Sequence, residues 1–373
     1  SRPSLSAILF AFLLLSLPSS YGESSPPNII LLYADDLGYT DLSCQGSDYY
    51  QTPNIDRLAK EGMTFTNAYA AAANCAPSRA SLMTGLYTPR HGVFTVANSD
   101  RGKAAHRRLV PTTNKTVLTR SLPTMAQVLK KAGYQTAVAG KWHLSDDPIP
   151  YGFDANFGGL KWGAPRSYFS PYRNPKLKDG PKGEHLPARL AQEICSWITL
   201  AQKKDNPFFV YFPFYSVHTP IQARQDLTER YAGRSGTHHK NAKYAAMIEA
   251  MDLGVGKILD LLDELEIADD TVVVFTSDNG PHGAVSNAKP LRGSKGMFYE
   301  GGIREPFLIR WPGKIKASSR ITTPIHQIDL LPTFASLGRA EAPQRLDGID
   351  LSPLFQGNSI PDRSLFWHFP AYL

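Results

Sequence analysis

Cysteine is scarce in this chain of 373 residues, which contains only three. Three cysteines cannot build a disulfide framework, and no two of them have the C-x-x-C spacing of a zinc ribbon or a thioredoxin-type redox pair. Long basic tracts are also missing, since 40 Lys and Arg stand against 33 Asp and Glu, a formal net charge of +7. This moderate excess suits acidic ligands without forming a nucleic-acid-binding arm, so we expect no nucleic-acid partner.

Apolar runs of the roughly 20 residues that a membrane span requires are likewise missing. Arg2 precedes a shorter apolar run at residues 7–15, and the small residues Ser20 and Gly22 follow it. This pattern is typical of a secretory signal peptide, which we assign to residues 1–22, with an uncleaved N-terminal anchor as the alternative. The sequence therefore predicts an exported protein, periplasmic or secreted, without stable membrane insertion.

The apolar stretch at residues 28–36 is continuous rather than alternating and too short for a helix, which predicts a strand buried on both faces. A helical pattern follows at residues 55–61. The same order recurs with helices at 122–132, 188–203 and 241–265, followed by strands at 136–139, 208–214 and 271–276, and a last strand at 307–311. This alternation predicts an α/β fold, a mostly parallel central sheet sandwiched by helices.

Ionisable or amide side chains follow four of these predicted strands. They lie in the segments 35–36 (DD), 140–143 (GKWH), 215–218 (YSVH) and 277–280 (SDNG). Each segment alone is also ordinary turn chemistry. Because ligands of an open parallel sheet bind outside the carboxyl ends of its strands, four such segments together indicate a functional site.

Oxygen ligands predominate in two of the four segments. Asp35, Asp36, Asp278 and Asn279 offer three carboxylates and one amide oxygen, a set that suits Ca²⁺ or Mg²⁺. Clustered carboxylates without a cation would raise one another's pKa values, so a bound metal explains the cluster. A zinc site that uses His143 or His218 is the competing interpretation.

Cys75 is the candidate nucleophile. Pro77 and Gly85 frame a short helix, so we expect Cys75 just before its N-terminus, where backbone N–H groups favour negative charge. An unmodified thiol there would have a lowered pKa. Three residues separate Cys75 from Arg79, whereas a cysteine phosphatase loop has five, so a thiol phosphatase fits poorly. A buried structural cysteine is the alternative.

Residues 75–79 read CAPSR and residues 133–143 read GYQTAVAGKWH. These segments resemble the two signatures of the type I sulfatases, the formylglycine-dependent members of the alkaline phosphatase superfamily. Shorter matches follow the family's order at residues 35–39, 52–56, 217–220, 277–280, 292–296 and 299–302. The resemblance implies that a formylglycine-generating enzyme oxidises Cys75 to formylglycine during maturation.

The resemblance also implies the roles of the individual site residues. The metal, usually Ca²⁺ in this family, would be bound by Asp35, Asp36, Asp278, Asn279 and an oxygen of the modified Cys75. Arg79 and Lys141 would hold the formylglycine, and Lys141, His218 and Lys295 would bind the sulfate. In the chemistry that this implies, a hydroxyl of the hydrated aldehyde attacks sulfur, His218 protonates the leaving alcohol, and His143 takes the proton whose loss releases sulfate.

The loop at residues 161–185 suggests the substrate. Its cations outnumber its two acids and comprise Lys161, Arg166, Arg173, Lys176, Lys178 and Lys182. The interleaved aromatic residues are Trp162, Tyr168, Phe169 and Tyr172. Charge for flanking sulfates and rings for sugar faces predict a sulfated polysaccharide, with Arg166 and Arg173 among its contacts. Solvated loop charges without a function are the alternative.

Two other functions compete with a sulfatase. The same metal and diol could hydrolyse phosphonate or phosphate esters, and a chain whose Cys75 is never converted would only bind sulfated glycans. We assign residues 23–340 to the catalytic domain. By resemblance, residues 341–373 begin a small C-terminal subdomain, which we expect to be truncated or missing beyond this point.

Overall fold

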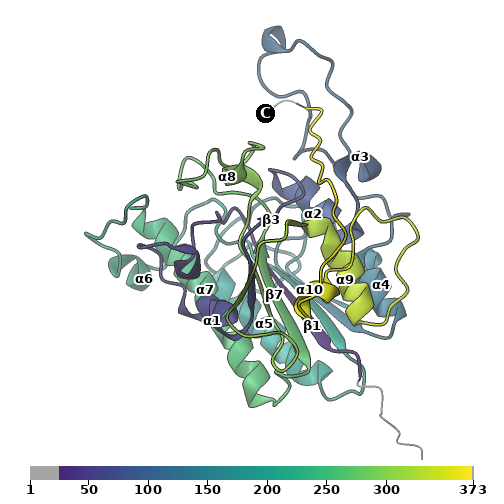
Figure 1. The fold of residues 1–373 in the computed structure, drawn as a ribbon. Coiled ribbons are helices and arrows are strands. Elements are labelled where there is room, and N and C mark those ends of the chain that lie inside the picture. The colour runs from purple at the N-terminus through teal and green to yellow at the C-terminus, as the bar shows by residue number, and fades with distance from the viewer. Residues whose placement is uncertain (1–24, 372–373) are drawn as a thin grey trace, which may run out of the picture.

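The computed structural model describes residues 25–371, so the predicted signal peptide at residues 1–22 lies outside the described residues. A twisted sheet forms the centre of the molecule, with helices packed around it (Figure 1). It has eight strands, in the order β5-β4-β6-β1-β7-β8-β2-β9. Its strands are β1 (Asn28–Ala34), β2 (Met63–Phe65), β4 (Gln135–Ala139), β5 (Ala155–Phe157), β6 (Phe208–Pro213), β7 (Thr271–Ser277), β8 (Phe307–Arg310) and β9 (Ser319–Ile321). A second, two-stranded sheet pairs β3 (Ala68–Tyr69) with β10 (Ile325–His326).

The strand directions confirm the mostly parallel sheet. β5, β4, β6, β1 and β7 pair with their neighbours in parallel. β8 runs antiparallel to β7, and β2 antiparallel to β8. Parallel strands covered on both faces explain the continuous apolar runs seen in the sequence.

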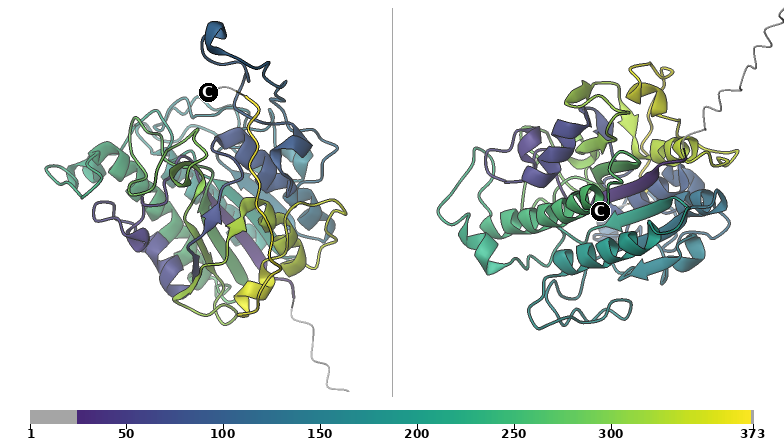
Figure 2. Two further views of the ribbon diagram at one scale, coloured as in Figure 1. Left: turned by 45° about the horizontal axis from the view of Figure 1, so that its top comes forward. Right: turned by 90° about the horizontal axis from the view of Figure 1, so that it is seen from below.

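Helices cover both faces of the sheet, which gives the predicted sandwich. On β1, Ile30 and Leu32 face one core cluster, whereas Ile29 and Leu31 face the other. The first cluster holds α1 (Pro53–Glu61), α5 (Leu186–Ala201) and α7 (Ala242–Glu264), and the second holds α2 (Cys75–Thr84), α4 (Met125–Lys131) and α9 (Leu330–Leu337). The long helices α5 and α7 lie side by side (Figure 2).

The shorter elements lie in the connections. The short α-helices are α3 (Thr88–His91), α6 (Gln225–Glu229), α8 (Glu300–Ile303) and α10 (Ser352–Phe355), and the 3₁₀ turns are Ser43–Gln45, Ala104–His106, Ile149–Tyr151 and Gln327–Asp329. Leu351, Leu354 and Phe355 pack into the same core cluster as α9. That residues 341–373 begin a separate subdomain stays a prediction. Within residues 25–371, no helix combines the length and the apolar character that crossing a bilayer would demand.

Candidate active site

The four strands with polar residues at their ends are neighbours in the sheet, in the order β4, β6, β1 and β7. Backbone hydrogen bonds continue beyond the strands and join the segments that follow them. Asp35 N–H donates to Ser216 O at 2.9 Å, Lys141 N–H to Pro213 O at 2.8 Å, and Asp278 N–H to the carbonyl at the end of β1 at 3.1 Å. The fold therefore brings the four segments together.

Cys75 lies at the centre of this edge. It is the first residue of α2, one position further into the helix than we expected, and Asn74 is the N-cap. Its Sγ lies within 4.8 Å of carboxylate oxygens of Asp35 and Asp278, and also within 4.8 Å of a carboxylate oxygen of Asp36 and a ring nitrogen of His218. The side chain is buried.

Two cations pair with two carboxylates behind Cys75, and all four side chains are fully buried. Arg79 donates from Nε and Nη2 to Asp278 Oδ2, at 3.1 and 2.7 Å. Lys141 Nζ donates to Asp35 Oδ2 at 2.6 Å. Burial alone would raise the pKa of Asp278, but Arg79 and Lys141 hold that pKa well below its usual range. Such pairing is what allows charges to be buried at all.

Asp36 has a different set of partners. Lys295 Nζ lies 2.7 Å from both of its carboxylate oxygens, and Asn279 Nδ2 donates to Oδ1 at 2.8 Å. His218 Nε2 lies 3.7 Å from Oδ2. The proposed metal ligands and the proposed sulfate-binding groups therefore share one cluster.

Two buried oxygens of this cluster support a cation site. Asp35 Oδ1 and Asn279 Oδ1 accept no hydrogen bond from any described residue, although Asp35 Oδ1 faces Arg79 Nη2 at 3.5 Å. A buried acceptor without a partner costs free energy, and a metal ion would satisfy both atoms. Because the orphaned atoms are carboxylate and amide oxygens, the residues present fit Ca²⁺ or Mg²⁺ better than zinc.

The two histidines differ in the pKa that the site gives them. Burial, together with Lys141 and Arg79, holds the pKa of His143 well below 6.5, so this ring is neutral. Burial would also lower the pKa of His218, but Asp35, Cys75 and Asp36 together outweigh it and the pKa is raised. His218 Nδ1 lies 2.7 Å from Thr219 O, so Nδ1 carries a proton and Nε2 faces the cluster. His143 thus suits proton acceptance and His218 proton donation.

The electrostatics also act on the cysteine. Burial opposes ionisation of the Cys75 thiol, but Lys141 and Lys295 outweigh it and lower its pKa to about 6. The site thus stabilises negative charge on the atom at this position, whether sulfur or oxygen.

Part of the basic loop borders the site. Arg166 stacks over the ring of Trp162 at 4.5 Å. Gly163 lies so close to the ring of His143 that a Cβ there would stand 2.9 Å from Nε2. Gly163 therefore lies next to His143, and the Trp162–Arg166 pair flanks it in the chain.

The rest of that loop differs from expectation. Tyr168 and Tyr172 are buried, and their hydroxyls donate to His218 O and Glu184 Oε2, both at 2.8 Å. The expectation that these two rings face a sugar is therefore wrong, because they serve as internal supports of the loop.

The loop cations also differ from one another. Lys161 and Lys176 pair with Asp146 and Asp147 at 2.9 and 2.7 Å. Arg173 is exposed, and no contact among the described residues joins it to the site. Its role as a substrate contact stays a prediction.

Glu305 is a buried acid at this site that sequence reasoning missed. The β7–β8 register pairs Thr276 with Phe307, and its continuation places Glu305 opposite Asp278. Burial and then Asp278 raise the pKa of Glu305 well above 4.5. The position of Glu305 beside Asp278 follows from the antiparallel pairing of β8 with β7, which the sequence pattern does not show.

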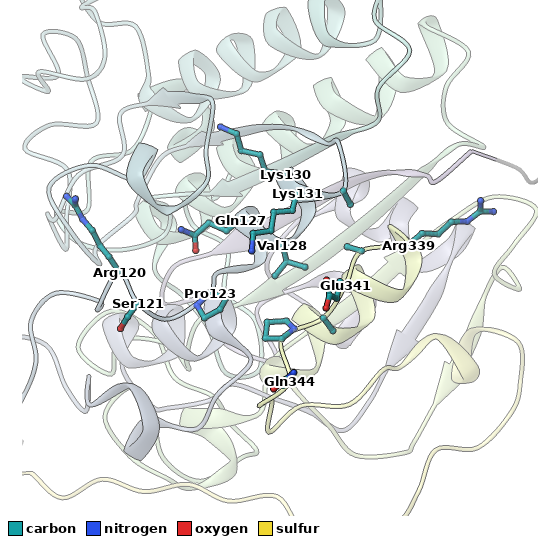
Figure 3. Close-up of a pocket in the computed structure, with 14 residues that line it drawn as sticks. Arg120, Ser121, Pro123, Gln127, Val128, Lys130, Lys131, Arg339, Glu341 and Gln344 are labelled. Atoms are coloured by element: carbon teal, nitrogen blue, oxygen red, sulfur yellow. The ribbon is translucent and has the colours of Figure 1, made fainter.

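A cavity of about 900 Å³ lies elsewhere, between α4 and residues 339–344 (Figure 3). Its lining includes Lys131 and Glu341 and none of the predicted site residues. The candidate site is therefore defined by its chemistry rather than by the volume of a cavity.

The fold and the polar cluster at its strand ends place the chain in the alkaline phosphatase superfamily. The family model described as Sulfatase matches residues 27–340. The chain belongs to the sulfatase family and is a sulfuric ester hydrolase, which confirms the resemblance seen in the sequence.

Relatives of known name support this assignment. The chain is 35% identical to a sulfatase of Formosa agariphila, over 100% of this chain and 80% of that protein. It is 34% identical to human N-acetylgalactosamine-6-sulfatase, over 93% of this chain and 69% of that protein. The crystal structure of Ps i-CgsB in complex with k-i-k-neocarrahexaose is similar with a TM-score of 0.78 and 33% identity, over 90% of this chain and 77% of that one.

Proposed function

We propose that this sulfatase hydrolyses sulfate esters of a carbohydrate through a formylglycine made from Cys75, with Ca²⁺ bound beside it. The observation that carries the proposal is the position of Cys75. It begins α2, and its Sγ lies within 4.8 Å of oxygens of Asp35 and Asp278 and, in a second group, of ligand atoms of Asp36 and His218, so one cation could be shared among them. A helix N-terminus and a cation both favour an anionic oxygen at that point.

The proposed formylglycine supplies the nucleophile, and the proposed Ca²⁺ supplies positive charge. Hydrated formylglycine offers one hydroxyl to attack sulfur and a second whose deprotonation releases sulfate, while Ca²⁺ held by Asp35, Asp36, Asp278 and Asn279 stabilises negative charge. Arg79 is fixed by Asp278 and also donates to Lys141 O at 2.8 Å. These contacts hold the Arg79 guanidinium in one position, so its positive charge is preorganised in this part of the site.

The remaining side chains bind the sulfate and move protons. Lys141 and Lys295 each use part of their hydrogen-bonding capacity on a carboxylate, and an ammonium group has three donors, so donors remain for sulfuryl oxygens. His218 Nε2 gives a proton to the leaving alcohol, and His143, held neutral by burial and its cationic neighbours, takes one from the nucleophilic residue.

The proposed substrate class is a sulfated carbohydrate. Two of the relatives point to sugars. One is an N-acetylgalactosamine-6-sulfatase, and the other, Ps i-CgsB, was solved in complex with k-i-k-neocarrahexaose. In this chain, the Trp162–Arg166 pair combines a ring with a cation and flanks Gly163, which lies against His143. Export by a signal peptide at residues 1–22, and maturation by a formylglycine-generating enzyme, belong to the same proposal.

Replacing Arg166 with alanine is expected to lower kcat/KM for a sulfated oligosaccharide about tenfold, the order of one cation contact. Turnover of a small aryl sulfate should change much less, because it carries no flanking sulfate for Arg166 to bind. Steady-state kinetics on both substrates measure this difference. Lys204→Ala is the matched control, since this exposed cation lies in the α5–β6 connection, at the opposite edge of the sheet. Equal kinetics of the Arg166 variant and the wild type on the oligosaccharide would contradict the assignment.

Replacing His218 with glutamine is expected to reduce kcat about 10²–10⁴-fold for a sugar sulfate, whose alcohol needs a proton to leave. The loss should be much smaller for an aryl sulfate with an acidic phenol. A comparison of the two leaving groups measures the proton that His218 donates. Equal losses on both would show that His218 has another role.

Turnover of an aryl sulfate and of the corresponding aryl phosphate by the purified protein tests the function itself. We expect the sulfate to be the better substrate. A preference for the phosphate would favour the phosphonate or phosphate ester hydrolase, and turnover of neither would favour a protein that only binds glycans.

A further inference from the structure

The backbone at Asp36 has a conformation that needs support. Its φ is 61°, in the left-handed region that non-glycine residues seldom adopt, and such residues persist only where their surroundings hold them. Asp36 N–H donates to Asp278 Oδ1, and Leu37 N–H donates to Ser277 Oγ, both at 3.1 Å. These bonds hold one side of the segment 36–41, which we call the Asp36–Asp41 turn.

Tyr244 holds the other side of this turn. It lies in the first turn of α7, where its N–H donates to the capping Asn241 Oδ1 at 3.2 Å, and its side chain is fully buried. Its hydroxyl lies 3.0 Å from Asp36 O and 2.8 Å from Asp41 Oδ2. One hydroxyl therefore joins the two ends of the Asp36–Asp41 turn to α7.

Asp41 is itself fixed by several segments. Its Oδ2 also accepts from Gly38 N–H at 2.9 Å, inside the turn. Its Oδ1 faces Ser286 Oγ and His239 Nε2, each at 3.5 Å. Among the described residues, the Asp41 carboxyl therefore faces Gly38 in the turn, Tyr244 in α7, His239 in the loop before α7 and Ser286 in the loop after β7.

We propose that Tyr244, together with Asp41, is a positioning residue for the metal ligand Asp36. The inference rests on the proposed Ca²⁺ site, and it concerns the preorganisation of that site rather than its identity. The Asp36 carboxylate must point between Lys295 and the other ligands, and its direction follows from the backbone that Tyr244 holds. Loss of such an outer partner typically weakens metal binding 10–100-fold.

Tyr244→Phe tests this role because it removes one hydroxyl and keeps the ring. Tyr49→Phe is the matched control, because the Tyr49 hydroxyl is buried without a hydrogen-bond partner among the described residues. The rings of Tyr49 and Tyr244 both pack against Tyr50, with centroids 5.3 and 5.8 Å from its own. The purified protein is freed of metal with a chelator and titrated with Ca²⁺ by calorimetry. We expect the Kd of Tyr244→Phe for Ca²⁺ to rise about 10–100-fold, and that of Tyr49→Phe to remain within about twofold of the wild type.

Two further readouts separate positioning from general damage. The Ca²⁺ concentration that half-maximally raises Tm should shift by the same factor, which remains measurable in a less stable variant. Turnover of an aryl sulfate should recover when Ca²⁺ is raised in proportion. A Tyr244→Phe protein that binds Ca²⁺ as the wild type does, or whose activity loss excess Ca²⁺ fails to restore, would overturn the inference alone. A wild-type protein that binds no Ca²⁺ would overturn the proposed metal site and this inference with it.

Discussion

Replacing Cys75 with serine is expected to reduce steady-state turnover of sulfate esters on the order of 10⁶-fold, the scale of a lost nucleophile. A serine hydroxyl at the start of α2 has the same cationic neighbours, so it can still take a sulfuryl group. It lacks the second hydroxyl on the same carbon, so sulfate cannot be expelled by elimination. Turnover of an aryl sulfate, with intact-protein mass spectrometry for one sulfuryl group per chain, measures both effects.

Cys195→Ser is the matched control for this variant. Cys195 is also a free, buried cysteine, but it lies in α5, on the face of the sheet opposite to α2. We expect its turnover to equal that of the wild type. Repeated turnover by Cys75→Ser at a rate near the wild type would show that the nucleophile is another group.

Replacing Arg79 with methionine is expected to lower the free energy of unfolding by about 3–5 kcal/mol, the typical result of removing one partner of a buried ion pair. Arg79 and Asp278 are both fully buried, so the methionine leaves that carboxylate without its fork of two donors. Ca²⁺ should restore part of the loss, because it compensates the same carboxylates. Urea denaturation with and without Ca²⁺ measures both quantities.

Arg224→Met is the control for Arg79→Met. Arg224 pairs with Asp226 at 2.6 Å, but the two side chains are 37% and 59% exposed, and solvent-exposed pairs contribute about 0–1 kcal/mol. Equal losses in the two variants would contradict the claim that Arg79 compensates buried charge. A loss in Arg79→Met that Ca²⁺ leaves unchanged would contradict a cation beside Asp278.

Much of the fold follows from local patterns in the sequence. β1, β4, β6 and β7 are buried on both faces, so each appears in the sequence as a continuous apolar run. Such a run identifies the element as a strand and shows where in the chain it lies. The long helices α5 and α7 carry apolar residues at helical spacing over more than ten positions. The alternation of strands and helices then predicts a parallel sheet, because two strands can pair in parallel only when a crossover connection, usually a helix, joins them.

The missed elements have physical reasons of their own. β2, β3, β5, β9 and β10 span two or three residues each, too few to show any period. α9 carries Pro332 near its start. A proline ring fits the first turn of a helix, but in a sequence pattern a proline normally indicates that a helix ends. The direction of β8 depends on its pairing with β7, which no local pattern records.

For the site, the sequence predicts which segments meet but not the position of every side chain. The segments after four strands converge as expected, because neighbouring parallel strands end at one edge. Tyr168 and Tyr172 could not be assigned correctly, since an aromatic residue in a long loop has no periodicity that distinguishes a buried ring from an exposed one. Glu305 and Tyr244 reach the site only through long-range register and packing.

Mass spectrometry of the tryptic peptide Glu61–Arg79, taken from protein made in the native host, tests the central claim most directly. The peptide contains Cys75, and cleavage after Lys60 and Arg79 releases it. We expect an aldehyde in place of the thiol at Cys75. An intact thiol in protein that turns over sulfate esters would contradict it.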